Sequence, residues 1–305
     1  MRISVMLLSI FCVLSVAAFF VYAQSNPQAV GLSTTPTTQA DLEFAVPAIS
    51  NNVLVMPGTS TPVSSWVDIG LVAHAGGTVG NVQGTNTIEA VQTNYELGHR
   101  VFELDFNLTS DGKLVGIHDW GGKAAKSWDE FSSKQVSGLF TPTSLEMFLD
   151  FLEQHEDAYI ITDTKSFDYT DEQITEQFQI LFDAASVRPE LRERIIVQVY
   201  NQKMYHLINK IYKYPNILYT LYMTPDTEAQ VVEFVRSENI PVIVMPPERA
   251  NQPFLSDIYA AGAKVFLHTL NDINDIKAWL AKGVSGFYTD DILPEQLVGL
   301  NDTLG

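Results

Sequence analysis

Short apolar segments alternate with amphipathic segments from Trp66 onward, and this alternation limits the possible folds more than any other feature. The apolar segments have the length and β-branched content of strands, and the segments between them carry apolar residues at helical spacing. Strands are expected at residues 69–73, 101–108, 159–164, 195–200, 217–223, 242–245, 264–270 and 286–289, with a further extended piece at 114–118. Helices are expected at residues 85–97, 144–154, 171–185, 203–212, 228–237, 254–261 and 273–282, and a last one begins at Pro294.

About eight strands, each followed by a helix, over roughly 240 residues predict an α/β fold, a TIM (β/α)8 barrel. An open, doubly wound sheet is the alternative. It is disfavoured because no Gly-x-Gly-x-x-Gly turn follows the first strand. In a barrel the chemistry belongs at the C-terminal ends of the strands, so polar residues should collect there.

The first 65 residues differ from the rest of the chain. Arg2 is followed by an apolar run to Val21, and Val21-Tyr22-Ala23 has the small residues of a cleavage site before Gln24. Residues 1–23 are therefore expected to be a signal peptide or an uncleaved membrane anchor, and residues 3–23 would then tether the chain. Both alternatives predict an exported protein, whether secreted, periplasmic or at the cell surface. The Pro-, Thr- and Ser-rich residues 24–65 predict a tether, and residues 66–305 form the expected barrel domain.

The charge of the chain excludes one class of partner. The 305 residues include 18 Lys and Arg against 36 Asp and Glu, which gives a net charge of −18. A nucleic-acid-binding protein needs a surplus of Lys and Arg for phosphate contacts, so nucleic acid is not an expected partner. The single cysteine, Cys12, excludes an internal disulfide framework and a Cys-rich metal site.

Polar residues do follow or interrupt the predicted strands. They are His74, Glu103, Asp105, His118, Asp163, Lys165, Gln198 and Tyr200. Because side chains alternate along a strand, Glu103 and Asp105 should face the same way. Asp163 and Lys165 are also two residues apart and should share a face. The side chains of both pairs would then meet at the barrel mouth.

This set of residue types predicts metal-assisted phosphodiester cleavage. Three carboxylates without a thiolate indicate a hard divalent cation, Mg²⁺ or Ca²⁺. Two histidines beside them indicate a general base and a general acid. Lys165 would suit a phosphate oxygen, and the cation would neutralise charge on the phosphoryl group.

The motifs resemble those of the glycerophosphodiester phosphodiesterase family, among the phosphatidylinositol phospholipase C-like barrels. The resemblance covers about residues 69 to 293. The matching elements are His74 with Gly76, Asn86-Thr87-Ile88-Glu89-Ala90, Gly98, Glu103-Leu104-Asp105, Thr109-x-Asp111-Gly112-x-Leu114-Val115, His118-Asp119, Asp163-x-Lys165, His268-Thr269-Leu270-Asn271 and the closing Gly283 to Asp290.

The resemblance implies a role for each site residue. His74 and His118 would be the acid–base pair, and Lys165 would contact the phosphate. A hydroxyl of the substrate's own glycerol can attack phosphorus in such enzymes, giving a cyclic phosphate that water then opens. The remaining residues are the metal ligands Glu103, Asp105 and Asp163 and the substrate-binding residues Gln198, Tyr200 and His268.

Four departures from the family pattern bear on the substrate. Ala75 replaces an Arg, and Thr85 replaces the acid that would partner it. Asp163 is one methylene shorter than the family's Glu, and Asp-x-Lys resembles the sphingomyelinase D branch. His268 replaces a Trp, which makes that part of the pocket wall polar.

Three hypotheses follow. The leading one is a metal-dependent phosphodiesterase that cleaves a glycerophosphodiester to an alcohol and glycerol phosphate. The second keeps the chemistry but takes a phospholipid, as phospholipase C or sphingomyelinase D does. The third is a non-catalytic barrel that binds a phosphorylated ligand. Ala75, which replaces an Arg of the family pattern, is the reason for considering it.

Three further histidines and one tyrosine lie outside these motifs, and no catalytic role is assigned to them. His99, His155 and His206 are interpreted as surface or helix-end residues, and Tyr222 would line the pocket if it ends a strand.

Overall fold

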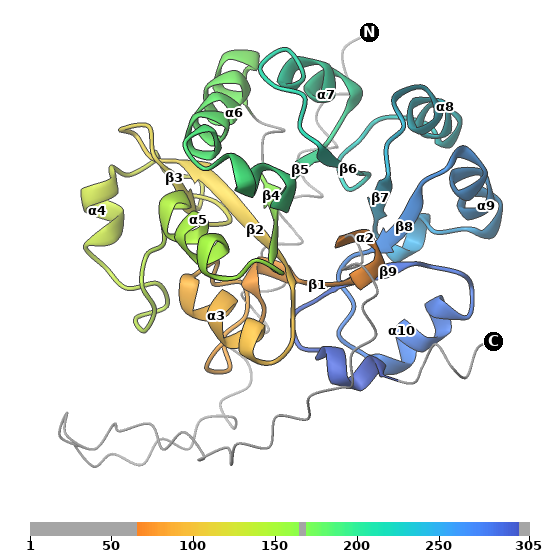
Figure 1. Cartoon of the computed structure of the whole chain (residues 1–305), viewed down its shortest axis with the longest axis horizontal. Coiled ribbons are helices and arrows are strands. Elements are labelled where there is room, and N and C mark those ends of the chain that lie inside the picture. Colours follow the sequence, from red (N-terminus) through yellow and green to blue (C-terminus); the bar gives the residue numbers. More distant parts are fainter. Residues whose placement is uncertain (1–65, 165–168, 299–305) are drawn as a thin grey trace, which may run out of the picture. The chain divides into compact units, whose positions relative to one another are not determined.

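The computed structural model describes residues 66–164 and 169–298, and there eight parallel strands close into a barrel (Figure 1). Going round the barrel, β1 pairs with β2 and β9, and each further strand pairs with its neighbours. The barrel strands are β1 (Leu71–Ala73), β2 (Val101–Leu108), β4 (Tyr159–Asp163), β5 (Ile195–Val199), β6 (Asn216–Thr220), β7 (Val242–Met245), β8 (Lys264–Leu267) and β9 (Gly286–Thr289). The predicted TIM barrel is confirmed.

Helices lie outside the strands along most of the barrel (Figure 1). They are α3 (Ile88–Glu96), α5 (Leu145–Gln154), α6 (Asp171–Ser186), α7 (Gln202–Ile208), α8 (Glu228–Glu238), α9 (Gln252–Ala261) and α10 (Ile273–Leu280), with the short α2 (Trp66–Ile69) before β1. The last predicted helix is a single 3₁₀ turn, η5 (Pro294–Leu297). Several helices begin at a capping side chain, as at Thr170 and Thr227, which bond to the third residue of the first turn.

The extended piece after β2 is not a barrel strand. It forms β3 (Leu114–Gly116), which pairs antiparallel with the end of β2. The turn at Gly112, with φ 78°, lets the chain fold back. The chain then forms the five-residue helix α4 (Trp128–Ser132) before it reaches α5, and sequence patterning did not predict this helix. We call residues 109–143 the hairpin excursion.

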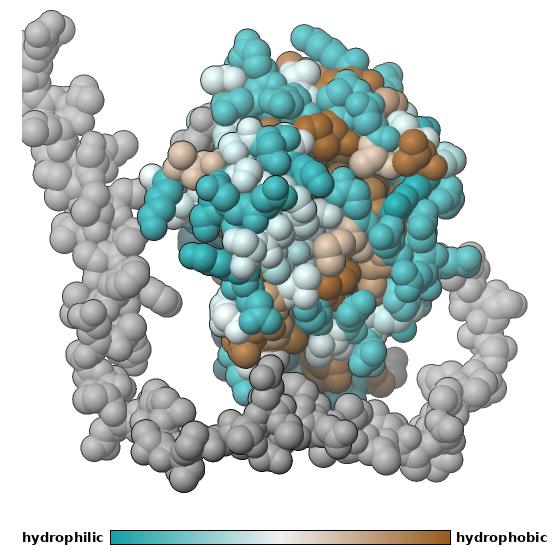
Figure 2. Space-filling model, turned by 90° about the vertical axis from the view of Figure 1, so that its left-hand side faces the viewer, coloured by the Kyte–Doolittle hydropathy of each residue, from teal (hydrophilic) through white to brown (hydrophobic). Residues whose placement is uncertain are grey.

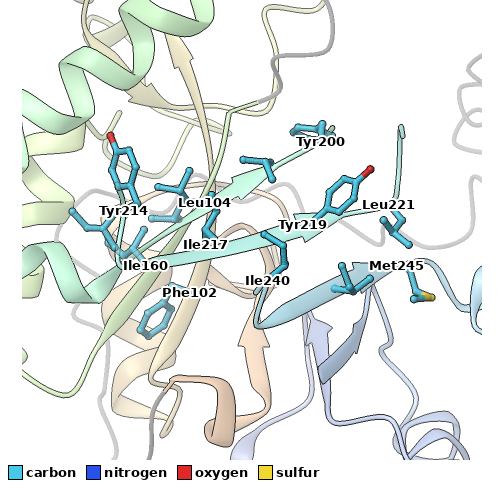
Figure 3. Packing of buried hydrophobic residues seen from close by; sticks show 14 of the residues in the cluster. Phe102, Leu104, Ile160, Tyr200, Tyr214, Ile217, Tyr219, Leu221, Ile240 and Met245 are labelled. Carbon is cyan, nitrogen blue, oxygen red and sulfur yellow. The ribbon is translucent and has the colours of Figure 1, made fainter. Parts of the chain in front are cut away.

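Alternation along the strands produces two layers of apolar contacts. One face of each strand points outward and packs on the helices, as Phe102, Leu104, Ile160, Ile217 and Tyr219 do (Figure 3). The other face points into the barrel and forms a separate cluster that fills its interior. That interior cluster comprises Trp66, Val72, Val101, Ile161, Ile196, Leu218, Val242, Val244, Phe266 and Tyr288.

Trp66 and Phe266 fill the N-terminal part of the interior. Their rings pack edge to face, with centroids 6.1 Å apart. Trp66 also donates a hydrogen bond from its indole Nε1 to Asn216 Oδ1, at 3.0 Å. A Cβ on Gly286 would lie 2.6 Å from the Phe266 ring, so only glycine leaves room for this packing. Together these contacts make a solid apolar base under the mouth of the barrel.

Figure 2 shows a largely hydrophilic face on which apolar side chains form small, separate patches. Within the described ranges, no helix is long and apolar enough to cross a membrane.

Some predicted features lie outside the described residues. They are the signal peptide or anchor at 1–23, the tether at 24–65, and Lys165.

Candidate active site

A cavity of about 230 Å³ opens at the C-terminal ends of the strands. It brings together residues from β1 to β9 that are far apart in the sequence. Its lining comprises His74, Glu103, His118, Asp163, Gln198, Tyr200, Thr220, Tyr222, Val244, His268 and Tyr288. Seven predicted site residues are in this set; the eighth, Asp105, lies beside Glu103 and Asp163, and Lys165 is not described.

Three buried carboxylates lie together at the mouth of the barrel. Glu103, Asp105 and Asp163 each offer an oxygen, and these atoms lie within 4.8 Å of one another. The strand register explains the proximity, because Asp105 on β2 is directly opposite Asp163 on β4. Glu103 is two residues earlier on the same face of β2.

Neighbouring groups fix the orientation of each carboxylate. The backbone N–H of Ala75 donates to Glu103 Oε2 at 2.9 Å. The Asn86 side chain donates to Asp105 Oδ2 at 2.8 Å and accepts from the Asp105 backbone at 2.9 Å. The hydroxyl of Tyr200 donates to Asp163 Oδ1. Each acid is thus held for binding before any ligand arrives.

These three residues fit a divalent cation. Their donors are all carboxylate oxygens, the ligands that Mg²⁺ and Ca²⁺ prefer. Each residue is at most 5% exposed, so water screens their mutual repulsion poorly. A bound cation would offset that repulsion and would supply charge neutralisation for a phosphoryl group.

His74 stands between the acidic group and the last strand. Its Nδ1 is 2.8 Å from Asp290 Oδ1, and its Nε2 is 3.9 Å from Glu103 Oε2. Asn271 donates to the other oxygen of Asp290 at 2.7 Å. Asp290 and Asn271 therefore orient His74 so that Nε2 faces the carboxylates. The closing motif contained Asp290, but sequence reasoning assigned it no role.

The surroundings of His74 change its acidity. Burial alone would lower its pKa, but the hydrogen bond to Asp290 and the charges of Glu103, Asp290 and Asp105 outweigh burial and raise the pKa to about 9. Burial would raise the pKa of Asp290, whereas hydrogen bonds from His74 and Asn271 hold it below its ordinary value. The charges of Glu103 and Asp105 are the ones that a bound cation would neutralise.

His118 occupies the rim of the cavity. Its side chain is 62% exposed, and its Nδ1 is 2.6 Å from Asp119 Oδ2. The buried Asn107 side chain donates to the backbone carbonyls of Ile117 and His118, at 2.8 and 3.0 Å. The backbone that carries His118 is therefore fixed, although its ring faces solvent.

Three rings form one wall of the cavity: Tyr222 follows β6, His268 follows β8, and Tyr288 lies on β9. The ring of His268 packs edge-on against Tyr222 and Tyr288, with centroids 5.7 and 6.4 Å away. The Tyr288 hydroxyl is buried and has no hydrogen-bond partner among the described residues. Burial and the charges of Glu103 and Asp163 raise the pKa of Tyr288 well above 10, so it is a neutral donor. Sequence reasoning did not identify Tyr288, because its position within an apolar strand resembles a core position.

The interpretation of His99 as a surface or helix-end residue is wrong in one respect. His99 follows α3, as expected, but it is only 3% exposed. Burial lowers its pKa to about 4, and the charge of Arg100 acts in the same direction. His155 and His206 do end or lie on helices, and neither lines the cavity.

A parallel barrel with acids and histidines at the C-terminal ends of its strands belongs to the class of TIM-barrel enzymes. Comparison with family models narrows this class. The model of the Glycerophosphoryl diester phosphodiesterase family matches residues 76–293. The chain belongs to this family and is a phosphoric diester hydrolase, so the hypothesis of a non-catalytic barrel is set aside.

Solved structures share the barrel at low sequence identity. A glycerophosphodiester phosphodiesterase from Parabacteroides distasonis is 19% identical, with a TM-score of 0.65 over 77% of this chain and 98% of that one. A phosphodiesterase from Oleispira antarctica, solved with the product sn-glycerol-3-phosphate, is 17% identical, with a TM-score of 0.61 over 76% and 96% of the two chains. A glycerophosphodiester phosphodiesterase from Agrobacterium tumefaciens is 16% identical, with a TM-score of 0.57 over 76% and 99%. The search of curated proteins found no match.

Proposed function

We propose that the protein hydrolyses glycerophosphodiesters to glycerol phosphate and an alcohol with the help of one divalent cation. The observation that carries the proposal is the cavity in which His74 and His118 flank three buried carboxylates. Family membership supports the reaction class, and the Oleispira structure contains the corresponding product.

The positions of the two histidines suggest their roles. His74 lies beside the carboxylates. In its neutral form, which a cation on Glu103 and Asp105 would favour, it can accept the proton of the attacking hydroxyl. His118 lies at the exposed rim, where it can donate a proton to the departing alcohol oxygen. The new bond joins the nucleophile oxygen to phosphorus, and the bond from phosphorus to the alcohol oxygen breaks. If a glycerol hydroxyl attacks first, water opens the resulting cyclic phosphate with the two roles reversed.

The acid–base roles can be tested with three single variants of the full chain. His74→Ala and His118→Ala should each lower kcat by about 10²-fold or more on glycerophosphodiesters. His206→Ala is the control, because this exposed histidine lies on α7 and does not line the cavity. Full activity of both cavity variants would refute the assignment, and ³¹P NMR of the products would identify the bond that breaks.

The cation is proposed to be Mg²⁺ or Ca²⁺, held by Glu103, Asp105 and Asp163. Removing metal with a chelator should abolish turnover, and adding back each ion separately should show which one restores it. Activity that persists in a metal-free preparation would contradict this part of the proposal.

A phospholipid substrate is the second candidate, and one observation favours it. Tyr222 and Met223 follow β6 at the mouth and are 57% and 48% exposed, which is unusual for large apolar side chains. Such residues could contact the acyl region of a lipid. Release of choline or a cyclic phospholipid from vesicles, with water-soluble diesters left intact, would establish this candidate over the first.

Export is proposed from residues 1–23. Mass spectrometry of the protein outside the cytoplasm should show Gln24 as the first residue if the segment is cleaved. A full-length chain in the membrane fraction would instead indicate an anchor. Full-length protein in the cytoplasm alone would contradict both.

A further inference from the structure

A second cavity, of about 370 Å³, shares one residue with the candidate active site. Its lining comes mainly from the hairpin excursion and includes Asp119, Lys126, Phe131 and Lys134. His118 is the residue that lines both cavities. A molecule held at His118 can therefore extend from one cavity into the other.

The second cavity carries positive charge in an acidic protein. Many of the described Lys and Arg side chains are engaged, as in Arg100 with Asp157 and Lys264 with Asp68, each at 2.6 Å. Among the described residues, Lys126 and Lys134 have no carboxylate within ion-pair distance. The one carboxylate of the lining, Asp119, is engaged by His118 and by the backbone N–H of Gly121. Both ammonium groups are thus available to an anion.

The cavity has a fixed frame. Ser127 and Glu130 form a reciprocal cap at the start of α4, and the Trp128 N–H donates to Asp111 Oδ1 at 2.8 Å. Phe131 packs edge-on against Trp120, with centroids 5.7 Å apart. Lys126 and Lys134 therefore flank an ordered helix, one before its first residue and one after its last, and Phe131 of that helix gives the cavity an apolar wall.

We propose that the second cavity binds the departing alcohol and that Lys126 and Lys134 recognise a second phosphate group on it. The inference rests on the proposed function, in which His118 protonates that alcohol. An alcohol bonded to phosphorus beside His118 has its far end directed into the cavity that His118 also lines. The substrate class is then a glycerophosphodiester whose alcohol is a phosphorylated polyol.

A matched substrate pair tests this preference. Glycerophosphoinositol and its 4-phosphate differ only by the second phosphate. The full-length protein should show a kcat/KM about tenfold higher for the 4-phosphate at low ionic strength, mainly through a lower KM, because charge-assisted hydrogen bonds add to binding. The advantage should shrink as salt is added, since both lysines are exposed.

Two variants connect the preference to the cavity. In Lys126→Ala/Lys134→Ala the ratio of the two kcat/KM values should fall to about one. Lys123→Ala should keep the ratio, because this exposed lysine belongs to the same excursion but lines neither cavity. A wild-type ratio of one or less would overturn the proposal. The proposal would also be overturned if the double variant changed kcat/KM for both substrates by the same factor, because the ratio of the two values would then be unaltered.

A binding measurement separates this inference from the proposed function. Calorimetric titration with myo-inositol 4-phosphate should show binding to the wild type, weaker binding to the double variant, and weaker binding of unphosphorylated inositol. If neither diester is hydrolysed but this pattern holds, the proposed function fails and the cavity assignment stands. If both diesters are hydrolysed equally well and no binding is seen, the cavity assignment fails alone.

Discussion

The interior of the barrel contains two regions that the same strands build, an apolar floor and a polar mouth. For six strands, a residue of the apolar floor is followed two positions later by a residue of the polar mouth. The pairs are Val72 and His74, Val101 and Glu103, Ile161 and Asp163, Ile196 and Gln198, Leu218 and Thr220, and Phe266 and His268. Since side chains two apart share a face, each strand supplies both regions without any change of direction.

The difference between the floor and the mouth is a division of tasks. The floor buries apolar surface and so stabilises the barrel. The mouth holds three carboxylates whose burial is unfavourable until a cation arrives. Stability and chemistry are therefore separated along each of these strands by about 7 Å, the length of two strand residues. Substitutions at the mouth should therefore lower activity without lowering stability, whereas substitutions in the floor should lower stability with little effect on substrate binding.

The largest effect is expected from a mouth carboxylate. Asp163→Asn should lower kcat/KM by at least about 10³-fold, because the proposed cation site loses one of its three negative charges. The same change should stabilise the metal-free protein, since it relieves repulsion from Glu103 and Asp105, and should reduce the rise in Tm that the cation causes. Asp257→Asn, at an exposed site on α9, is the control. A metal-free variant less stable than the wild type would contradict the account of the mouth.

The floor should respond in the opposite way. Phe266→Ala should lower the free energy of unfolding by about 3–5 kcal/mol, because it leaves a cavity beside Trp66. Urea titration measures this loss, and KM of the protein that remains folded should be little changed. Val187→Ala, at a site 80% exposed, should change stability by less than about 0.5 kcal/mol. If Phe266→Ala also lowered the free energy of unfolding by less than about 0.5 kcal/mol, the floor would not be the stabilising region.

Two histidines with opposite pKa shifts extend the comparison. At the mouth acids raise the pKa of His74 to about 9, whereas His99, away from the cavity, has its pKa lowered to about 4. Between pH 6.5 and about 4 the unfolded chain binds a proton at His99 and the folded chain does not. Stability should therefore fall as pH decreases through this range, by up to about 1.4 kcal/mol per pH unit from this group.

The test for His99 compares two proteins by urea titration. His99→Gln lacks this proton, so the stability advantage of the wild type over the variant should narrow from pH 6.5 down to pH 4. A difference that stays constant over that range would show that His99 titrates normally in the folded state.

The smallest effect concerns one hydroxyl in the wall. Tyr288→Phe should raise KM by about 2- to 10-fold, the value of one neutral hydrogen bond, if the buried hydroxyl donates to a substrate oxygen. Stability should be unchanged or higher, because no protein partner is lost. Tyr214→Phe is the matched control: its hydroxyl donates to the Phe178 carbonyl at 3.1 Å, so it should lose stability and keep KM. If Tyr288→Phe instead lowered stability and left KM unchanged, Tyr288 would not be a substrate-binding residue.

The sequence predicts most of the barrel because its periodicity is local. Strands and helices were expected within a few residues of their observed bounds. The errors occur where a short element lacks a periodic pattern. The helix α4 was missed because its five residues are too few for a detectable helical face, whereas the extended piece expected at 114–118 is confirmed as the hairpin strand β3.

The candidate site could be predicted only as far as strand alternation reaches. Glu103, Asp105 and Asp163 were recognisable because strand spacing places them on inward faces. The contact of Asp290 with His74 joins residues 216 positions apart, and only closure of the barrel brings β9 next to β1. Tyr288 was missed because an inward tyrosine in an apolar strand resembles packing until its hydroxyl is found without a partner.

The two-residue step from floor to mouth also affects how such a barrel can acquire a new specificity. Each of the six strands contributes an upper position whose side chain faces the cavity, while the residue two positions earlier packs in the interior cluster. His268, two residues after Phe266, is one such upper position, and its ring contacts Tyr222 and Tyr288 in the cavity wall. Adaptation to another ligand can therefore proceed one upper position at a time, without any need to redesign the scaffold below.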